Sequence, residues 1–139
     1  MNKLIQTSFI AATIFASQCF AEIAVVVHPS NSANISAEDI ERIFLGKKKA
    51  FSSGDTAVPI NLNEGDATRA SFNEKALNKN SSQLKAYWSK LVFTGKGTPP
   101  KEVNSSAEVL KLVSSNPNMI GYIDASIVDG SVKVISKLN

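Results

Sequence analysis

Hydrophobic residues along the chain fall into two patterns, short β-branched runs and longer stripes with helical spacing. The run "EIAVVVH" ends at Pro29 and predicts a buried strand, and "AVPIN" predicts a second strand with Pro59 at an edge or entry position. Near the C-terminus, two more runs flank Asp129-Gly130, a dipeptide that favours a hairpin turn. The predicted strands span residues 22–28, 57–61, 119–123 and 131–135.

Four segments carry apolar residues at helical spacing and begin at good capping residues. The strongest periodicity predicts a helix whose apolar stripe faces the core, with Trp88 as a core residue rather than a platform for a ligand. That stripe consists of Leu84, Tyr87, Trp88, Leu91 and Val92. The predicted helices run from a Ser36 cap to a stop at Gly46, over residues 67–78, from a cap at Ser81 or Ser82, and from a capping box at Ser105 and Glu108 through Ser114.

The predicted order of elements is β-α-β-α-α-α-β-β. Strands that alternate with helices are typical of an α/β layer with a mixed sheet. Removal of a 21-residue leader would leave 118 of the 139 residues, enough for one hydrophobic core and too few for two domains. We therefore expect residues 22–139 to form one domain, a mixed sheet flanked by about four helices.

The first 21 residues have the layout of a secretory signal peptide. Lys3 precedes an apolar-rich run over residues 4–15, and a small-residue pattern ends at Ala21. Polar residues interrupt the run, which is also shorter than the ~20 residues that a bilayer span needs. Gln18 before Cys19 disfavours a lipoprotein. We therefore expect cleavage after Ala21 and a periplasmic location.

The residue census disfavours several chemistries. Beyond the leader there is no cysteine for a disulfide or a thiol nucleophile, and His28, next to Pro29, is the only histidine. Glu64 and Asp66 are the only close acidic pair in a turn, and Arg69 beside them would oppose a metal cation. A net charge of +3 for the full chain does not indicate nucleic acid. We expect no enzyme activity, no cofactor, no metal site and no nucleic-acid partner.

The candidate site is the turn "EGDATRASF", residues 64–72, between a predicted strand and a predicted helix. The start of a helix presents unpaired amides and a partial positive charge, so a turn of small residues there can hold an anion. An ordinary junction with Asp66 as its N-cap is the alternative, because the carboxylate can accept from the amides that an anion would need. The candidate ligand-binding residues are Gly65, Asp66, Ala67, Thr68 and Arg69.

Four motifs, in this order, resemble the second half of the PstS-like phosphate-binding proteins of ABC transporters. The first is similar to the strand that crosses between the two lobes of those periplasmic binding proteins, and the third is similar to their Gly-Ser-Gly-Thr-Arg loop. The resemblance implies a single lobe of a periplasmic-binding-protein-like fold. The motifs are "AVVVHPSN" (residues 24–31), "ISAEDIERIFLGK" (35–47), "EGDATRASF" (64–72) and "VSSNPNMIGYID" (113–124).

Two departures from the family pattern bear on function. The chain has about the length of one lobe, and the family's early phosphate-contacting loop has no counterpart in it. Asp66 stands where the family has serine, Ala67 where it has a second glycine, and Leu62 near where many members place an arginine, so Thr68 and Arg69 alone keep anion-binding chemistry. Asp66 then either caps its own helix or accepts a hydrogen bond from a protonated phosphate oxygen, as an aspartate does in the family.

The resemblance implies a periplasmic solute-binding module for phosphate or a similar oxyanion, associated with ABC-type phosphate uptake or sensing. The alternative is an interaction protein that keeps the binding fold but recognises a transporter component, a membrane sensor or another envelope partner. It would use the face that the second lobe covers in the family. A lobe by itself also leaves apolar surface that self-association would cover.

Overall fold

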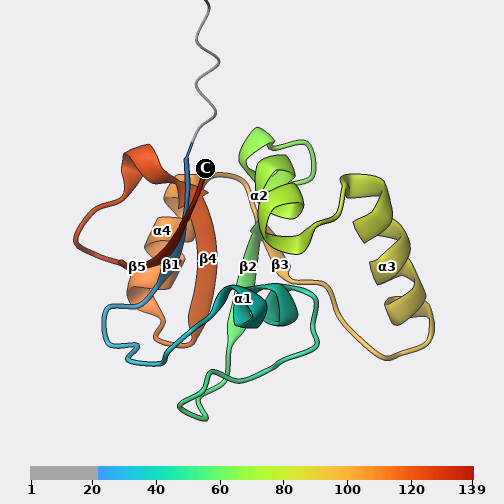
Figure 1. The fold of residues 1–139 in the computed structure, drawn as a ribbon, viewed down its shortest axis with the longest axis horizontal. Coiled ribbons are helices and arrows are strands. Elements are labelled where there is room, and N and C mark those ends of the chain that lie inside the picture. Colours follow the sequence, from blue (N-terminus) through green and yellow to red (C-terminus); the bar gives the residue numbers. More distant parts are fainter. Residues whose placement is uncertain (1–21) are drawn as a thin grey trace, which may run out of the picture.

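The computed structural model describes residues 22–139, and the predicted signal peptide, residues 1–21, lies outside the described residues. In this part of the chain the fold is α/β, as predicted, with a five-stranded mixed sheet and four α-helices (Figure 1). None of these helices is long and apolar enough to span a membrane. The strands are β1 (Ile23–Val27), β2 (Val58–Leu62), β3 (Lys101–Val103), β4 (Met119–Asp124) and β5 (Lys133–Leu138); the helices are α1 (Ala37–Phe44), α2 (Ala67–Leu77), α3 (Ser81–Phe93), α4 (Ser106–Ser115) and the short 3-10 helix η1 (Ala125–Ile127).

The strand order across the sheet is β3-β2-β4-β1-β5. β2 runs parallel to β3 and β4, whereas β1 is antiparallel to β4 and β5. β1 therefore has a neighbour on each side, and every one of its residues is buried, as its continuous apolar run predicts. Pro59 pairs with Ile120 near the start of β2, so this proline marks the entry to an inner strand and not an edge.

The hairpin predicted at Asp129-Gly130 is wrong. β4 and β5 do not pair with each other, because β1 lies between them and pairs with both. The dipeptide still forms a turn, in which the Asp129 carboxylate accepts a hydrogen bond from the Ser131 amide at 2.9 Å. Two strands joined by a turn give the same local sequence signal whether they pair or flank a third strand.

The sequence pattern missed β3, which is only three residues long and mostly exposed. It pairs in parallel with β2, and Glu102 lies opposite Asn61 in that pairing. A strand this short, with two charged residues, has neither an apolar run nor a clear alternation to reveal it. Its consequence for the site is large, because it brings Glu102 to the end of β2 where α2 begins.

Helix caps are mostly where the sequence places them. Ser36 caps α1 and Ser105 caps α4, as predicted. The predicted capping box at Ser105 and Glu108 is only half formed, because the Glu108 carboxylate accepts from the Asn104 amide, at 2.8 Å, and not from the amide of Ser105. α3 differs, because Asn80 is its N-cap and accepts a hydrogen bond from the amide three residues further on at 2.9 Å. The prediction of Ser81 or Ser82 as the cap is therefore wrong, since asparagine is as good a cap as serine and three candidates stand side by side.

An aromatic cluster joins α1, α2 and β4. Phe72 stacks on Tyr122 with ring centroids 3.8 Å apart, and Phe44 meets Phe72 edge-on at 4.8 Å. Successive residues of a strand face opposite sides of the sheet, so Gly121 faces α4, where an added Cβ would lie 2.5 Å from Val109. Helices α1 and α2 thus cover one face of the sheet and α4 covers the other (Figure 1).

α3 corrects the prediction made from its apolar stripe. The helix lies at one end of the molecule, beyond the β3 edge of the sheet and not over a face (Figure 1). Leu84 is the one buried residue of its stripe, Trp88 is half-buried, and Val92 is 54% exposed. The periodicity correctly predicted a helix, but the stripe faces loops and a cleft because no sheet surface is left for it.

Candidate functional site

The predicted anion-binding turn connects β2 to α2. Gly65 has a φ of 92°, a left-handed conformation that glycine adopts without strain, and Asp66 is the N-cap of α2. The Asp66 carboxylate accepts a hydrogen bond from the Thr68 amide at 2.8 Å. Among the described residues, the Arg69 amide does not donate a second hydrogen bond to this carboxylate. The turn therefore has the capped geometry, with the side chain of Asp66 on one of the amides that an anion would use.

Arg69 points back along the end of the sheet. Its Nη1 atom donates to the Leu62 carbonyl oxygen at 2.9 Å and to the Glu102 carboxylate at 2.6 Å. The Arg69 side chain is only 15% exposed, whereas Glu102 is about half exposed. The guanidinium charge is thus largely balanced by an acid that β3 supplies, which lowers its attraction for an external anion.

Buried polar groups support the site from beneath. The Tyr122 hydroxyl accepts a hydrogen bond from the Leu62 amide at 3.2 Å and donates one to the side-chain oxygen of Asn61. Burial raises the pKa of Tyr122 well above its usual value, so the hydroxyl keeps the proton that it donates. This network fixes the last residues of β2 and, through the Leu62 carbonyl, the position of Arg69.

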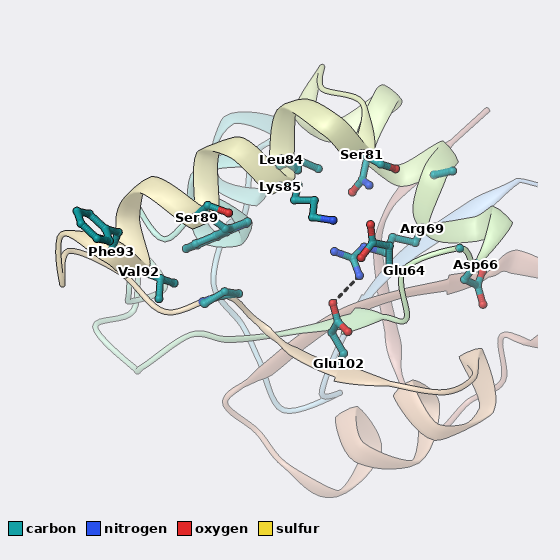
Figure 2. A pocket seen from close by; sticks show the side chains of 15 residues that line it. Glu64, Asp66, Arg69, Ser81, Leu84, Lys85, Ser89, Val92, Phe93 and Glu102 are labelled. Carbon is teal, nitrogen blue, oxygen red and sulfur yellow. Dashed lines mark hydrogen bonds and ion pairs between the residues drawn. The ribbon is translucent and has the colours of Figure 1, made fainter.

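A cleft of about 570 Å³ opens between the start of α2, α3 and the segment that leads into β3 (Figure 2). One end is charged, with three acids and two bases, and the other end is apolar. Figure 2 shows Arg69 between Glu64 and Glu102, and Phe93 at the far end of the cleft from Asp66. The charged lining residues are Glu64, Asp66, Arg69, Lys85 and Glu102, and the apolar ones include Leu84, Trp88, Val92, Phe93 and Pro99.

Asn73 lines the cleft from α2, one helical turn after Arg69. It is 2% exposed, and its side-chain oxygen has no hydrogen-bond partner among the described residues. A buried amide oxygen without a donor costs stability, about 1–3 kcal/mol, and Asn73 carries this unpaired acceptor beside the cleft.

The structure brings together only part of the predicted site. Gly65, Asp66 and Arg69 line the cleft, whereas Ala67 and Thr68 are absent from its lining. Sequence reasoning missed the contribution of Asn73, Trp88 and Glu102. Asn73 lies four residues after Arg69 on the same helix face, so its spacing in the sequence could have identified it. The position of Glu102 could not be identified in this way, because it depends on the pairing of β3 with β2.

No family model and no curated protein matches this chain. Solved structures do match in fold. A protein from Clostridium perfringens assigned as a phosphate ABC transporter substrate-binding protein, solved with bound phosphate, aligns with a TM-score of 0.66 at 24% identity over 84% of this chain and 45% of that protein. An ABC-type phosphate transport receptor from Vibrio cholerae aligns with a TM-score of 0.65 at 21% identity over 84% of this chain and 46% of its own.

PstS from Borrelia burgdorferi aligns with a TM-score of 0.60 at 19% identity, over 84% of this chain and 48% of its own. This chain therefore spans less than half the length of each of these proteins. The resemblance seen in the four sequence motifs is confirmed at the level of fold: residues 22–139 have the fold of about one lobe of a PstS-type phosphate-binding protein.

Proposed function

We propose that this chain is a periplasmic solute-binding module that takes phosphate or a similar oxyanion at the start of α2. It would serve ABC-type phosphate uptake or sensing. The observation that supports this is the β2–turn–α2 junction, which holds Thr68 and Arg69 at a helix start within a fold shared with phosphate-binding proteins. The solved neighbours are binding and transport proteins, and we propose no catalytic role.

Affinity at this site is expected to be low. An incoming oxyanion must share the Thr68 amide with the Asp66 carboxylate and draw Arg69 from Glu102. Charge-assisted hydrogen bonds are worth ~1.5–3 kcal/mol each, so losing two costs at least ~3 kcal/mol. At ~1.4 kcal/mol per decade, this weakens a micromolar site towards the millimolar range. A protonated phosphate lessens the conflict, because its hydroxyl can donate to Asp66.

Calorimetric titration of residues 22–139 with phosphate, sulfate and acetate at two salt concentrations tests the proposal. We expect phosphate binding in the millimolar range that weakens with salt, because exposed charges are screened. Arg69→Ala should abolish it, and Glu102→Gln should tighten it severalfold because Arg69 loses its internal partner. Arg42→Ala, which removes an exposed arginine of α1, is the matched control. Equal binding by the Arg69 and Arg42 variants would rule out the site.

An interaction protein is the second candidate. The capped helix start and the internally paired Arg69 favour it, as do Val92 and Phe93, which are exposed at the end of α3. The partner would be a transporter component, a membrane sensor or a second copy of the chain. If the folded protein gives no heat on titration with phosphate, the interaction protein would replace the oxyanion-binding module as the favoured function.

A further inference from the structure

The end of α3 carries exposed apolar side chains surrounded by lysines. We call Lys90, Val92, Phe93 and Lys96 the α3 tip. Phe93 is 93% exposed and Val92 is 54% exposed, the two highest values among the exposed large hydrophobic residues of the described chain. Figure 2 shows Phe93 at the end of its helix, far from Asp66.

The charge around the tip is of one sign. Five lysines and no acidic residue occur from Lys79 to Lys101, although acidic residues are nearly as frequent as basic ones in the whole chain. Ion pairs of the described residues involve the bases Lys48, Arg69 and Lys137, and none of the lysines in that segment. Lys49 and Lys96 also line one hollow with Val92, and that hollow has no acidic residue in its wall.

The backbone holds the lysines beside the apolar side chains. Lys90 and Phe93 are three residues apart in a helix and therefore share a face. Gly95 has a φ of 69°, which turns the chain, and the Lys96 amide donates to the Leu91 carbonyl at 2.8 Å. Lys96 is thereby held against the last turn of α3.

Most backbone carbonyls in the last turn of α3 have hydrogen-bond partners within the chain. The Thr94 amide donates to the Lys90 carbonyl at 3.1 Å, and the Gly95 amide donates to the Val92 carbonyl at 3.1 Å. The Thr94 hydroxyl donates to the Lys90 carbonyl as well, at 2.9 Å. Three of the last four carbonyls of the helix, those of Lys90, Leu91 and Val92, therefore accept hydrogen bonds from within the chain, which reduces the cost of removing water from them.

We propose that the α3 tip docks on an anionic lipid surface. Phe93 and Val92 enter the boundary between headgroups and acyl chains, and the surrounding lysines pair with lipid phosphates. A fluid anionic interface suits this tip better than a folded partner, because a specific protein interface needs about 800 Å² from each side and the tip offers two projecting apolar side chains. Docking through Phe93 leaves Asp66, at the other end of the cleft, away from the lipid.

Vesicle cosedimentation of residues 22–139, which contain the whole sheet and core, tests this docking. The probes are vesicles of phosphatidylglycerol and phosphatidylcholine in equal parts, with pure phosphatidylcholine as the neutral comparison. We expect binding to the anionic vesicles only, weakened by salt. The single tryptophan, Trp88, lies four residues before Val92, so its fluorescence should shift to shorter wavelength on binding.

Paired variants separate lipid docking from general charge. Each lysine near an anionic surface contributes about fivefold, so Lys90→Gln with Lys96→Gln should weaken binding about 25-fold. Phe93→Ala should weaken it about tenfold or more, the effect of withdrawing one large apolar side chain. The matched controls are Lys111→Gln on α4 and Ile127→Ala on η1, an exposed lysine and an exposed hydrophobic residue elsewhere, and both should bind as the parent does.

Three outcomes would overturn the proposal. The first is no binding to anionic vesicles by a folded protein, including the case in which only an acidic protein partner is captured. The second is equal binding to neutral vesicles. The third is a loss in the Lys111 and Ile127 controls as large as that in the tip variants. Because the tip residues are exposed, all variants should melt at the parent temperature, so a folding defect would be visible separately.

Discussion

Asp66 determines how much of the helix start is open to a ligand. Its carboxylate accepts from the Thr68 amide, while Arg69, three residues later, is turned onto Leu62 and Glu102. Both groups that would attract an oxyanion are therefore engaged within the protein. A ligand would have to compete with two carboxylates of the protein, those of Asp66 and Glu102. Because the competition depends only on these two side chains, substitutions can change it without altering the fold.

The double variant Asp66→Ser with Ala67→Gly tests this competition. It replaces the charged acceptor on the Thr68 amide by a neutral hydroxyl that a ligand can displace more easily, and it gives the chain the Gly-Ser-Gly-Thr-Arg loop of the PstS-like proteins. We expect tighter phosphate binding, by a few kcal/mol at most, that weakens with salt and still requires Arg69. Serine is nearly as good a cap as aspartate, and the new glycine costs up to ~1 kcal/mol, so stability should fall only slightly.

Asp66→Ala is the control for this variant. It removes the cap and the competing carboxylate but does not supply the second glycine, so the melting temperature should fall and phosphate affinity should rise only slightly, less than in the double variant. If the double variant instead binds phosphate more weakly than the parent, self-capping does not limit affinity. Asp66 would then act as an acceptor for a protonated ligand oxygen, and the parent protein would already be a working oxyanion receptor.

Elements of this fold are positioned by close contacts as much as by their own propensities. α4 packs on β4 at Gly121, where the absence of a side chain lets Val109 and Val113 approach the strand. α3 does not pack on a strand in this way, and its Trp88 packs over Gly46 and Gly97 instead. The two helices thus end up in different settings, α4 against the sheet and α3 beside a cleft.

Gly121→Ala should destabilise the protein by about 1–3 kcal/mol, because its Cβ would lie 2.5 Å from Val109 and α4 would have to move. Urea denaturation would measure the change in the free energy of unfolding. Gly130→Ala is the matched control, since an added Cβ there meets nothing within 4 Å. In a protein that already carries Val109→Ala, Gly121→Ala should lower the free energy of unfolding by less than it does in the parent. If the effects of the two substitutions were strictly additive, that would contradict the contact between these residues.

At the scale of the whole molecule, the site and the α3 tip are placed at opposite ends of one cleft. Glu64, Asp66 and Glu102 gather near the start of α2 (Figure 2), and Lys90 and Lys96 lie at the end of α3. The small net charge of the chain conceals this separation. A protein arranged in this way can present one end to a surface and the other to a solute.

The proposed location depends on removal of residues 1–21. We predict a mature N-terminus at Glu22, because the small residue Ala21 follows a short apolar run in the manner of a signal-peptide cleavage site. Mass spectrometry of the protein recovered from the periplasm would show it. A mass that still includes residues 1–21, or a lipid on Cys19, would contradict both the cleavage and the expected soluble periplasmic form.

Much of this protein was determined by the sequence itself. The caps at Ser36, Asp66 and Ser105 involve hydrogen bonds across two or three residues, so the local sequence contains both partners. The β1 run and the helix periodicities depend on neighbours a few residues apart. For the same reason the α/β class and the position of the β2–α2 turn could be predicted without coordinates.

Tertiary structure alone decided the contacts between distant segments. Glu102 meets Arg69 across 33 residues, and Tyr122 reaches Asn61 across 61, in both cases because strands pair in a particular order. The insertion of β1 between β4 and β5 and the exposed setting of α3 have the same origin. Strand order and free sheet surface are properties of the assembled chain, and no window of local sequence contains the competing partners that settle them.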